Sequence, residues 1–321
     1  MESAPHVLII TGSDDNYAPG VLVLIASASF HNPGARFAVL DMGISAENRD
    51  RIDRLAQRLG TTIRRIEIAP HMFDHLTVKR THLTRSTYLR LLIPRLFSDE
   101  DRVIYMDCDM VVMGDMSELQ RVPLGTAIMA AVPCPSPDEA ELAATEHIAG
   151  TYVNAGLLVM NLPVWRDEHI AEKCLALLSD GQRPLLSEDQ SAINIAADGR
   201  VVLLPKEYNV YSDPAAYRQV EDLPIMPIVL HYVVNNKPWN ARAHLGQIWD
   251  FHAERIADLM PPRKPLTLKR WISRLNHDRK RLLGLLMMRR KYIIQRRVTQ
   301  QMDEVVAKRY LERAAALIKQ G

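Results

Sequence analysis

Short apolar runs of β-forming residues alternate with helical stretches over residues 6–260, and this alternation constrains the fold more than any other feature. It is typical of α/β proteins, in which helices cover a central sheet. We predict strands at residues 6–10, 36–40, 62–68, 102–106, 126–132, 156–161, 200–204 and 225–232. We predict one helix that follows the first loop and ends near residue 30, and further helices at residues 45–60, 83–96, 164–179, 187–197 and 243–259.

Two carboxylates follow the predicted strand at residues 102–106, in the sequence Asp107-Cys108-Asp109. Ligands of open α/β sheets lie beyond the carboxyl ends of strands, and Mg²⁺ and Mn²⁺ prefer carboxylate oxygens and are often shared with phosphates. The pattern therefore favours a divalent cation held against the phosphates of a nucleotide. A second Asp-x-Asp, at residues 99–101, precedes the strand in a polar loop, and we expect it to be a solvated turn.

The cysteines and apolar runs indicate the redox compartment and the membrane topology that we expect for the chain. Its 321 residues, 47% hydrophobic and 24% charged, suffice for a large buried core. Cys108, Cys134 and Cys174 are odd in number and lack C-x-x-C spacing, so we expect a reducing compartment and neither a disulfide framework nor a zinc site. The N-terminus lacks the pattern of a signal peptide. The longest nearly apolar run, residues 21–30, is about half of the roughly 20 residues that a membrane span requires, so we predict no transmembrane segment.

The net charge of +2 hides a strong asymmetry along the chain. Residues 263–297 hold 13 Lys and Arg residues and one acidic residue, a net +12, whereas residues 1–262 carry −11. The proline-rich stretch at residues 261–265 is the best boundary. We therefore divide the chain into residues 1–260 and a basic helical tail at residues 261–321.

The tail has three interpretations. It could bind an anionic membrane surface, bind nucleic acid, or pack as a helical extension on the rest of the chain. Its basic run, residues 277–297, holds one aromatic residue among Leu, Met and Ile residues, which suits a lipid interface better than base stacking. We therefore favour an anionic membrane surface through residues 263–297 and expect no nucleic-acid partner.

The loop after the first strand contains Asp14, Asn16 and Tyr17. A carboxylate and an amide suit hydrogen bonds to a base or ribose, and the aromatic ring suits base stacking. The loop lacks G-x-G-x-x-G, so a dinucleotide site is not supported. The alternative is a turn with a helix cap, since Asp and Asn favour both.

On the predicted helix at residues 83–96, Arg90 could reach a diphosphate, or it could be solvated or ion-paired.

Two later segments combine amide, small and carboxylate side chains. Asn154 and Ala155 precede a predicted strand, where the amide could hold a sugar hydroxyl; a β-bulge is the alternative. Asp189 and Gln190 begin a predicted helix, where they could face the anomeric carbon of a sugar. Acidic residues in the first turn of a helix also serve its dipole, which is the alternative there.

His231 ends the strand predicted at residues 225–232, and Lys237 follows in a Lys-Pro-Trp sequence. An imidazole could complete a metal site, and a lysine ammonium could neutralise a leaving phosphate. A lone histidine is more often not a ligand, but the neighbouring Lys-Pro-Trp favours a ligand here.

Taken in this order and spacing, the segments resemble glycosyltransferase family 8 over residues 6–260. The closest likeness is to bacterial lipopolysaccharide and lipooligosaccharide α-glycosyltransferases. The resemblance implies an α/β fold of the GT-A, Rossmann-like type with a mixed central sheet, here with a basic α-helical C-terminal extension. It implies a UDP-sugar donor, Mn²⁺ (with Mg²⁺ as the alternative), a glycan or glycolipid acceptor, and transfer with retention of anomeric configuration.

The resemblance also implies roles for individual residues. It assigns the metal to Asp107, Asp109 and His231, and catalysis to Asp189 and Gln190. It assigns donor binding to a longer set, which comprises Asp14, Asn16, Tyr17, Arg90, Asp107, Cys108, Asp109, Asn154, Ala155 and Lys237. The transferred sugar would be galactose or glucose, and the enzyme would lie on the inner face of the cytoplasmic membrane.

Two positions depart from the family pattern. Ser191 replaces the second carboxylate of the family's D-Q-D, and Val234 replaces a glycine before the lysine. A valine does not easily adopt positive φ, so the loop could close differently over a diphosphate. These departures leave open a nucleotide-sugar-binding protein that has lost transfer. The polar segment at residues 133–150 is predicted to face the acceptor.

Overall fold

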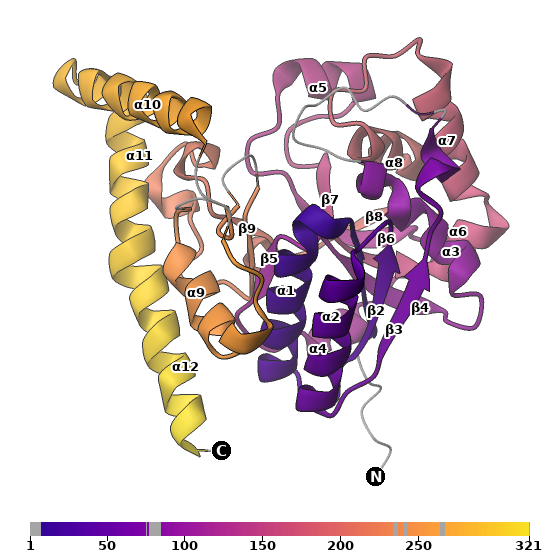
Figure 1. Ribbon diagram of the computed structural model, residues 1–321. Coiled ribbons are helices and arrows are strands. Elements are labelled where there is room, and N and C mark those ends of the chain that lie inside the picture. The colour runs from indigo at the N-terminus through magenta and orange to yellow at the C-terminus, as the bar shows by residue number, and fades with distance from the viewer. Residues whose placement is uncertain are drawn as a thin grey trace.

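A mixed sheet of seven strands forms the centre of the molecule (Figure 1). The computed structural model describes residues 8–74, 76, 85–233, 237–240, 243–263 and 267–320. In spatial order, the strands are β3 (Ile63–Glu67), β2 (Arg36–Asp41), β1 (Leu8–Ser13), β4 (Arg102–Met106), β7 (Val153–Asn161), β6 (Met129–Pro133) and β8 (Val201–Leu203). Strand β7 is antiparallel to β4 and β6, and the other neighbouring pairs are parallel. The predicted α/β class with a mixed sheet is confirmed.

A second, three-stranded sheet was not predicted. It contains β5 (Met110–Val112), β10 (Val229–His231) and β9 (Val210–Tyr211), in that order. Strand β10 runs antiparallel to β5 and parallel to β9. Because β5 begins four residues after β4 ends, the chain turns directly from the central sheet into this smaller one.

Helices cover both faces of the central sheet (Figure 1). We call residues 1–260 the body. Its helices are α1 (Ala18–His31), α2 (Ala46–Leu59), α3 (Ile93–Leu96), α4 (Ser117–Arg121), α5 (Glu139–Thr145), α6 (Leu162–Asp167), α7 (Ile170–Asp180), α8 (Asp189–Ala197) and α9 (Gly246–Glu254). Helix α1 is apolar on all sides and almost wholly buried, which explains its lack of an amphipathic pattern. Helix α2 begins at the predicted cap Ser45 and ends at Gly60 with φ 60°, a conformation that favours glycine.

Three of the predicted elements differ from the structure. The predicted helix at residues 83–96 is a 3₁₀ helix, Arg85–Leu92, followed by the short α3, and residues 83 and 84 lie outside the described residues. The predicted helix at 164–179 is two helices, because His169 between α6 and α7 adopts a left-handed conformation with φ 54°. Only Val229–His231 of the strand predicted at 225–232 is extended.

The last helices of the tail pack on the body. They are α11 (Arg290–Gln301) and α12 (Lys308–Gln320), joined by a π-helical turn. Val298, Met302 and Val306 are buried in the same core as α1. The hydroxyl of Tyr310 lies 3.0 Å from Nε2 of His31 and 2.5 Å from Nε2 of His252. The alternative of a helical extension packed on the body therefore describes α11 and α12.

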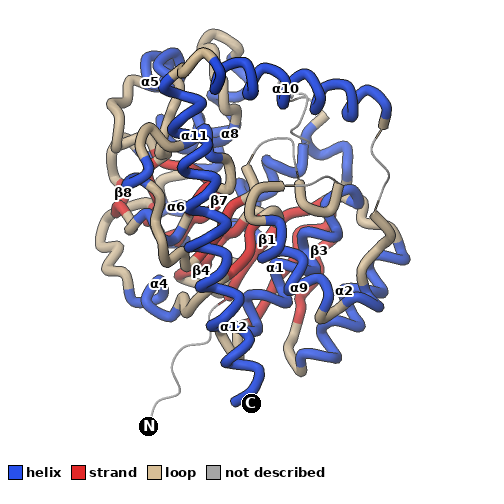
Figure 2. Tube along the Cα trace, turned by 90° about the vertical axis from the view of Figure 1, so that its left-hand side faces the viewer, coloured by secondary structure: helices blue, strands red, loops and turns tan. Residues whose placement is uncertain are grey.

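Helix α10 (Leu268–Leu286) differs from its neighbours, because it extends away from the body (Figures 1 and 2). Within the described chain, no helix combines the length and apolar character that spanning a bilayer requires.

Candidate active site

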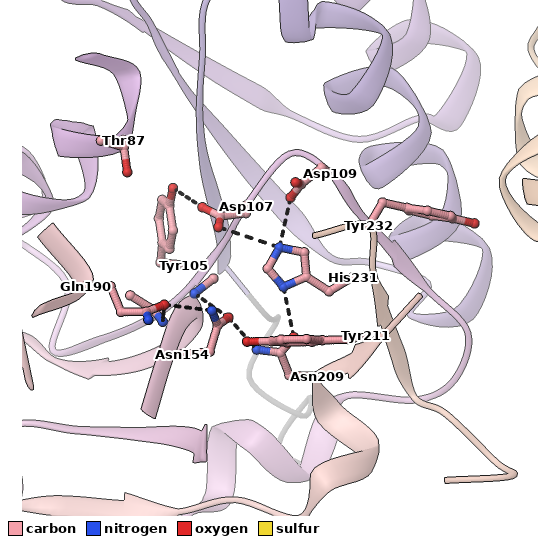
Figure 3. A network of polar contacts seen from close by, with 12 residues as sticks. Thr87, Tyr105, Asp107, Asp109, Asn154, Gln190, Asn209, Tyr211, His231 and Tyr232 are labelled. Carbon is pink, nitrogen blue, oxygen red and sulfur yellow. Dashed lines mark hydrogen bonds and ion pairs between the residues drawn. The ribbon is translucent and has the colours of Figure 1, made fainter. Parts of the chain in front are cut away.

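The turn from β4 into β5 brings the predicted metal ligands together. The amide of Asp107 donates to the carbonyl of Gly156 (2.7 Å), and the amide of Met110 donates to the carbonyl of Asp107 (3.2 Å). Strand β5 then pairs with β10, in which His231 lies opposite Met110. As a result, ligand atoms of Asp107, Asp109 and His231 all lie within 4.8 Å of one another (Figure 3).

The orientation of His231 suits metal binding. Its Nδ1 lies 3.0 Å from Oδ1 of Asn209, and an amide oxygen only accepts, so Nδ1 carries the proton. Nε2 faces Oδ1 of Asp109 at 3.1 Å and is the ring nitrogen available to a metal. That carboxylate oxygen is buried and has no hydrogen-bond partner within the described chain. A carboxylate oxygen and an imidazole nitrogen at this separation are a donor set that divalent metals bind, so the residues present fit a divalent metal.

Lys237 holds the other side of Asp109. Its ammonium donates to Oδ2 of Asp109 and to the carbonyl of Tyr232 (2.7 Å). Burial acts to raise the pKa of the Asp109 carboxyl, but Lys237 and His231 outweigh burial and lower this pKa well below its usual range. Asp109 is therefore a permanent carboxylate, as a metal ligand must be.

Arg90 links the metal carboxylates to α8. Its side chain is 5% exposed and makes ion pairs of 2.9 Å with both Asp107 and Asp189. The guanidinium lies over the ring of Tyr105, 4.6 Å from its centroid, and donates to the carbonyl of Ala155. The sequence left open whether the Arg90 side chain is solvated or ion-paired. The structure shows that it is ion-paired and buried.

Asp189 begins α8 in a buried, strained position. Burial raises the pKa of the Asp189 carboxyl to about 6, although Arg90 and the hydroxyl of Thr87, which donates at 2.7 Å, act against this rise. The preceding Glu188 has φ 51°, an uncommon conformation outside glycine, and accepts a hydrogen bond from Tyr88 (3.1 Å). Strained backbone of this kind clusters at functional sites.

Gln190 and Asn154 form an amide pair beside the metal cluster (Figure 3). Nδ2 of Asn154 donates to Oε1 of Gln190 (2.7 Å), and Nδ2 of Asn209 donates to Oδ1 of Asn154 (2.7 Å). A side chain at Gly156 would place a Cβ 2.6 Å from His231 and 2.9 Å from Asp107. The small residue therefore permits the close approach expected of the Asn-Ala-Gly segment, which lies inside β7. The register of β7 against β6 shifts across this segment, from Leu158 opposite Ala131 to Val153 opposite Pro133, which agrees with the alternative of a β-bulge.

The first loop borders this cluster. The backbone amide of Asn16 donates to Oδ1 of Asp14 (2.9 Å), so the loop is also the capped turn of the alternative. The ring of Tyr17 packs edge to face on Trp239, with 5.6 Å between centroids. The ring of Trp239 and the carbonyl of Cys108 both lie against Gly20 of α1, so this end of the loop adjoins the turn between Asp107 and Asp109. Burial raises the pKa of the Tyr17 hydroxyl.

Cys108 lies between the two metal carboxylates in a buried position. Burial raises the pKa of its thiol well above the usual range, so the side chain is a neutral thiol and is unsuited to metal binding. A Cβ on Gly20 would lie 2.4 Å from the Cys108 carbonyl oxygen, so α1 packs directly on this turn. The three cysteines are free, as predicted, and Asp99 and Asp101 are exposed in a turn, as predicted.

Some contributors to the site carry no sequence signal. Asn209 sets the histidine tautomer, and Tyr105 donates to Asp107 (2.8 Å). A buried asparagine or tyrosine near a strand has many ordinary explanations in a single sequence. The departure at Val234 lies outside the described residues.

Comparison with known proteins identifies relatives of the whole body. A family model described as glycosyl transferase family 8 matches residues 8–243. General stress protein A of Bacillus subtilis is 27% identical over 250 residues, which cover 73% of this chain and 87% of that protein. The lipopolysaccharide 1,3-galactosyltransferase of Salmonella typhimurium is 28% identical over 256 residues, which cover 73% of each. A crystal structure of the galactosyltransferase LgtC with donor and acceptor sugar analogues has a TM-score of 0.66 at 26% identity, covering 82% of this chain and 98% of that chain.

Proposed function

Because the chain belongs to glycosyltransferase family 8, we propose that it moves a hexose, galactose or glucose, from a UDP-sugar to a glycan or glycolipid acceptor with retention of anomeric configuration. Its fold is the GT-A fold that the resemblance implied. The similarity to a lipopolysaccharide galactosyltransferase supports a hexose donor and a surface glycan as acceptor.

The observation that carries the proposal is the cluster of Asp107, Asp109 and His231 beyond the end of β4. Two carboxylates and an imidazole suit Mn²⁺, with Mg²⁺ as the alternative, since imidazole favours transition metals. When bound, such a cation would neutralise the diphosphate leaving group. The Lys237 ammonium, which lies against Asp109, supplies a second positive charge for that diphosphate.

The remaining residues divide between the nucleotide and the sugar. Asp14, Asn16 and Tyr17 belong to the first loop, in which Tyr17 packs on Trp239, and are proposed to hold the uridine. Cys108 and Ala155 are proposed to contact the donor through their backbone, since a buried thiol and a methyl group offer little else.

On the sugar side, Asp189 is proposed to offset the positive charge that develops at the sugar ring. This role needs its ionised form, which a pKa of about 6 makes the major form at neutral pH. Gln190 is proposed to act beside it and to orient Asn154, to which its Oε1 is hydrogen-bonded.

Turnover of a panel of nucleotide sugars tests this proposal. With Mn²⁺, UDP-galactose or UDP-glucose should be hydrolysed, while the ADP- and GDP-hexoses should not, because the first loop would recognise the uracil. Binding of a UDP-hexose without turnover, with or without acceptor glycans, would favour the alternative of a nucleotide-sugar-binding protein. Failure to bind any UDP-sugar would contradict both.

We further propose that α10 holds the enzyme on the anionic inner face of the cytoplasmic membrane. Trp271, Leu275, Leu282 and Leu286 are 52%, 49%, 59% and 71% exposed. At 3.6 residues per turn, they fall within about 60° of one another on the helix. The net charge of +12 over residues 263–297 complements anionic lipid, and each basic residue near such a surface gains roughly 1 kcal/mol.

Point substitutions in α10 test the membrane proposal better than removal of the tail. Removing residues 263–321 would expose the core that Val298 and Met302 cover. Trp271→Ser with Leu282→Ser removes exposed apolar area only, so turnover of a soluble donor should persist. Sedimentation with phosphatidylglycerol vesicles should be lost, whereas Leu317→Ser, an exposed apolar residue on α12, should leave it intact. Equal sedimentation of all three proteins would contradict the proposal, and binding to duplex DNA at physiological salt would favour a nucleic-acid partner.

A further inference from the structure

Glu141 is a buried carboxylate at the edge of the site, outside the residues assigned to the metal, the nucleotide and the sugar. It lies on α5, between β6 and β7, and is 2% exposed. Its Oε1 accepts hydrogen bonds from the hydroxyls of Tyr152 (2.8 Å) and Ser191. Its Oε2 is buried without a hydrogen-bond partner in the described part of the chain. Burying a carboxyl group is costly, and such groups usually serve a specific contact.

A chain of hydrogen bonds connects Glu141 to the amide pair of the site. Oε1 of Glu141 acts as an acceptor, so the Tyr152 hydroxyl donates to it and offers its lone pairs to Nε2 of Gln190 (3.0 Å). The amide of Gln190 is thereby fixed with Oε1 on the opposite side. That oxygen accepts from Nδ2 of Asn154 (2.7 Å) and from the amide of Ala155 (3.2 Å). The two ends of an amide differ in donor and acceptor character, so a rotated Gln190 would break all three bonds.

Ser191 explains why this carboxylate comes from α5. Residue 191 follows Gln190, where the family pattern has a second carboxylate and this chain has a hydroxyl. The Ser191 hydroxyl donates to Glu141 and accepts from the amide of Ser187 (3.0 Å). An aspartate at 191 would place a second carboxylate against Glu141, and two carboxylates sharing one site repel each other. Serine at 191 and glutamate at 141 are therefore mutually compatible.

We propose that Glu141 is a positioning residue for sugar transfer, which fixes the amide of Gln190 through Tyr152 and replaces the carboxylate that residue 191 lacks. This inference rests on the proposed function, because it assigns Gln190 to the sugar end of a donor. The uridine end is assigned above to the first loop, around Tyr17, and not to Gln190. Loss of Glu141 should therefore alter what happens to the sugar and leave UDP binding unchanged.

Two substitutions that break the chain at different points test the proposal. Glu141→Ala and the nearly isosteric Tyr152→Phe should each lower kcat for UDP-galactose hydrolysis by about 10- to 100-fold, the usual effect of losing an orienting partner. Because both act through one chain, the double variant should be no slower than the slower single variant. Glu141→Gln should restore most of the turnover, since its amide oxygen can accept both hydrogen bonds. Glu139→Gln, an exposed acid on the same helix, is the matched control and should behave as wild type.

Ser191→Asp provides the reciprocal test. Alone it should impair turnover because its carboxylate meets Glu141, and adding Glu141→Gln should recover it. Wild-type kcat in Glu141→Ala or in Tyr152→Phe would overturn the inference. A loss of UDP affinity and melting temperature together with kcat in these two variants would also overturn it, because it would indicate a structural role only.

Binding measurements separate this inference from the proposed function. If the wild-type protein turns over no nucleotide sugar, with or without acceptor glycans, the proposed function fails, and calorimetric titrations with UDP and UDP-galactose still test Glu141. Weaker binding of UDP-galactose with unchanged binding of UDP in Glu141→Ala would support its positioning role. Unchanged binding of both would overturn it.

Discussion

Asp109→Asn is expected to lower donor turnover by roughly 10³-fold or more, because losing even an outer-shell partner of a metal ligand costs about 10- to 100-fold. Oδ1 of Asp109 lies 3.1 Å from Nε2 of His231, so Asp109 is the carboxylate best placed to share a cation with it. An amide oxygen in its place is a weaker ligand and carries no charge. The measurement is the rate of UDP release from a UDP-hexose as a function of Mn²⁺ concentration.

Stability must be separated from ligand loss in this variant. Lys237 is 8% exposed and pairs with Asp109, so Asp109→Asn alone leaves a buried ammonium without its partner. The double variant Asp109→Asn/Lys237→Met removes both charges and should recover the melting temperature while staying inactive. Wild-type turnover in Asp109→Asn, or full wild-type activity in EDTA, would disprove the metal assignment.

Arg90→Met should have the largest effect on folding of any single substitution at the site, about 3–5 kcal/mol of lost stability. The guanidinium is buried between Asp107 and Asp189, and its removal leaves two carboxylates near each other without the charge that separates them. Methionine fills much of the same volume, so the loss reports charge and not a cavity. Chemical denaturation of the metal-free protein measures it.

Arg36→Met is the matched control for this prediction. Arg36 also pairs with a carboxylate, Glu100, but its side chain is 49% exposed. Exposed pairs contribute about 0–1 kcal/mol, so this variant should lose little stability. Equal losses in the two variants would contradict a special role for the buried position of Arg90.

The central sheet could be predicted well because its strands are short apolar runs separated by clear helices and turns. The strand at Arg102–Met106 was predicted to the residue, and α2 carried both its cap and its terminal glycine. The second sheet could not be predicted, since β5 and β9 have three and two residues and are stabilised by partners distant in sequence. The break at His169 was also invisible, because a left-handed histidine leaves no local pattern.

The sequence indicated candidate residues for the site, but it did not indicate how their side chains are arranged in space. The structure brings Asp107, Asp109 and His231 together through the pairing of β5 with β10, which a single sequence does not reveal. The roles of Asn209 and Glu141 depend on hydrogen bonds between segments far apart in the chain, so neither could have been selected from the sequence.

Proton NMR of the reaction with UDP-α-galactose and Mn²⁺ tests the central proposal most directly. In a time course faster than mutarotation, the first galactose signal should be that of the α anomer, identified by its small anomeric coupling, together with UDP. The signal should be absent in EDTA and return when Mn²⁺ is restored. A β anomer formed first would contradict a retaining transferase, and α-galactose formed at full rate in EDTA would contradict the metal-dependent site at Asp107, Asp109 and His231.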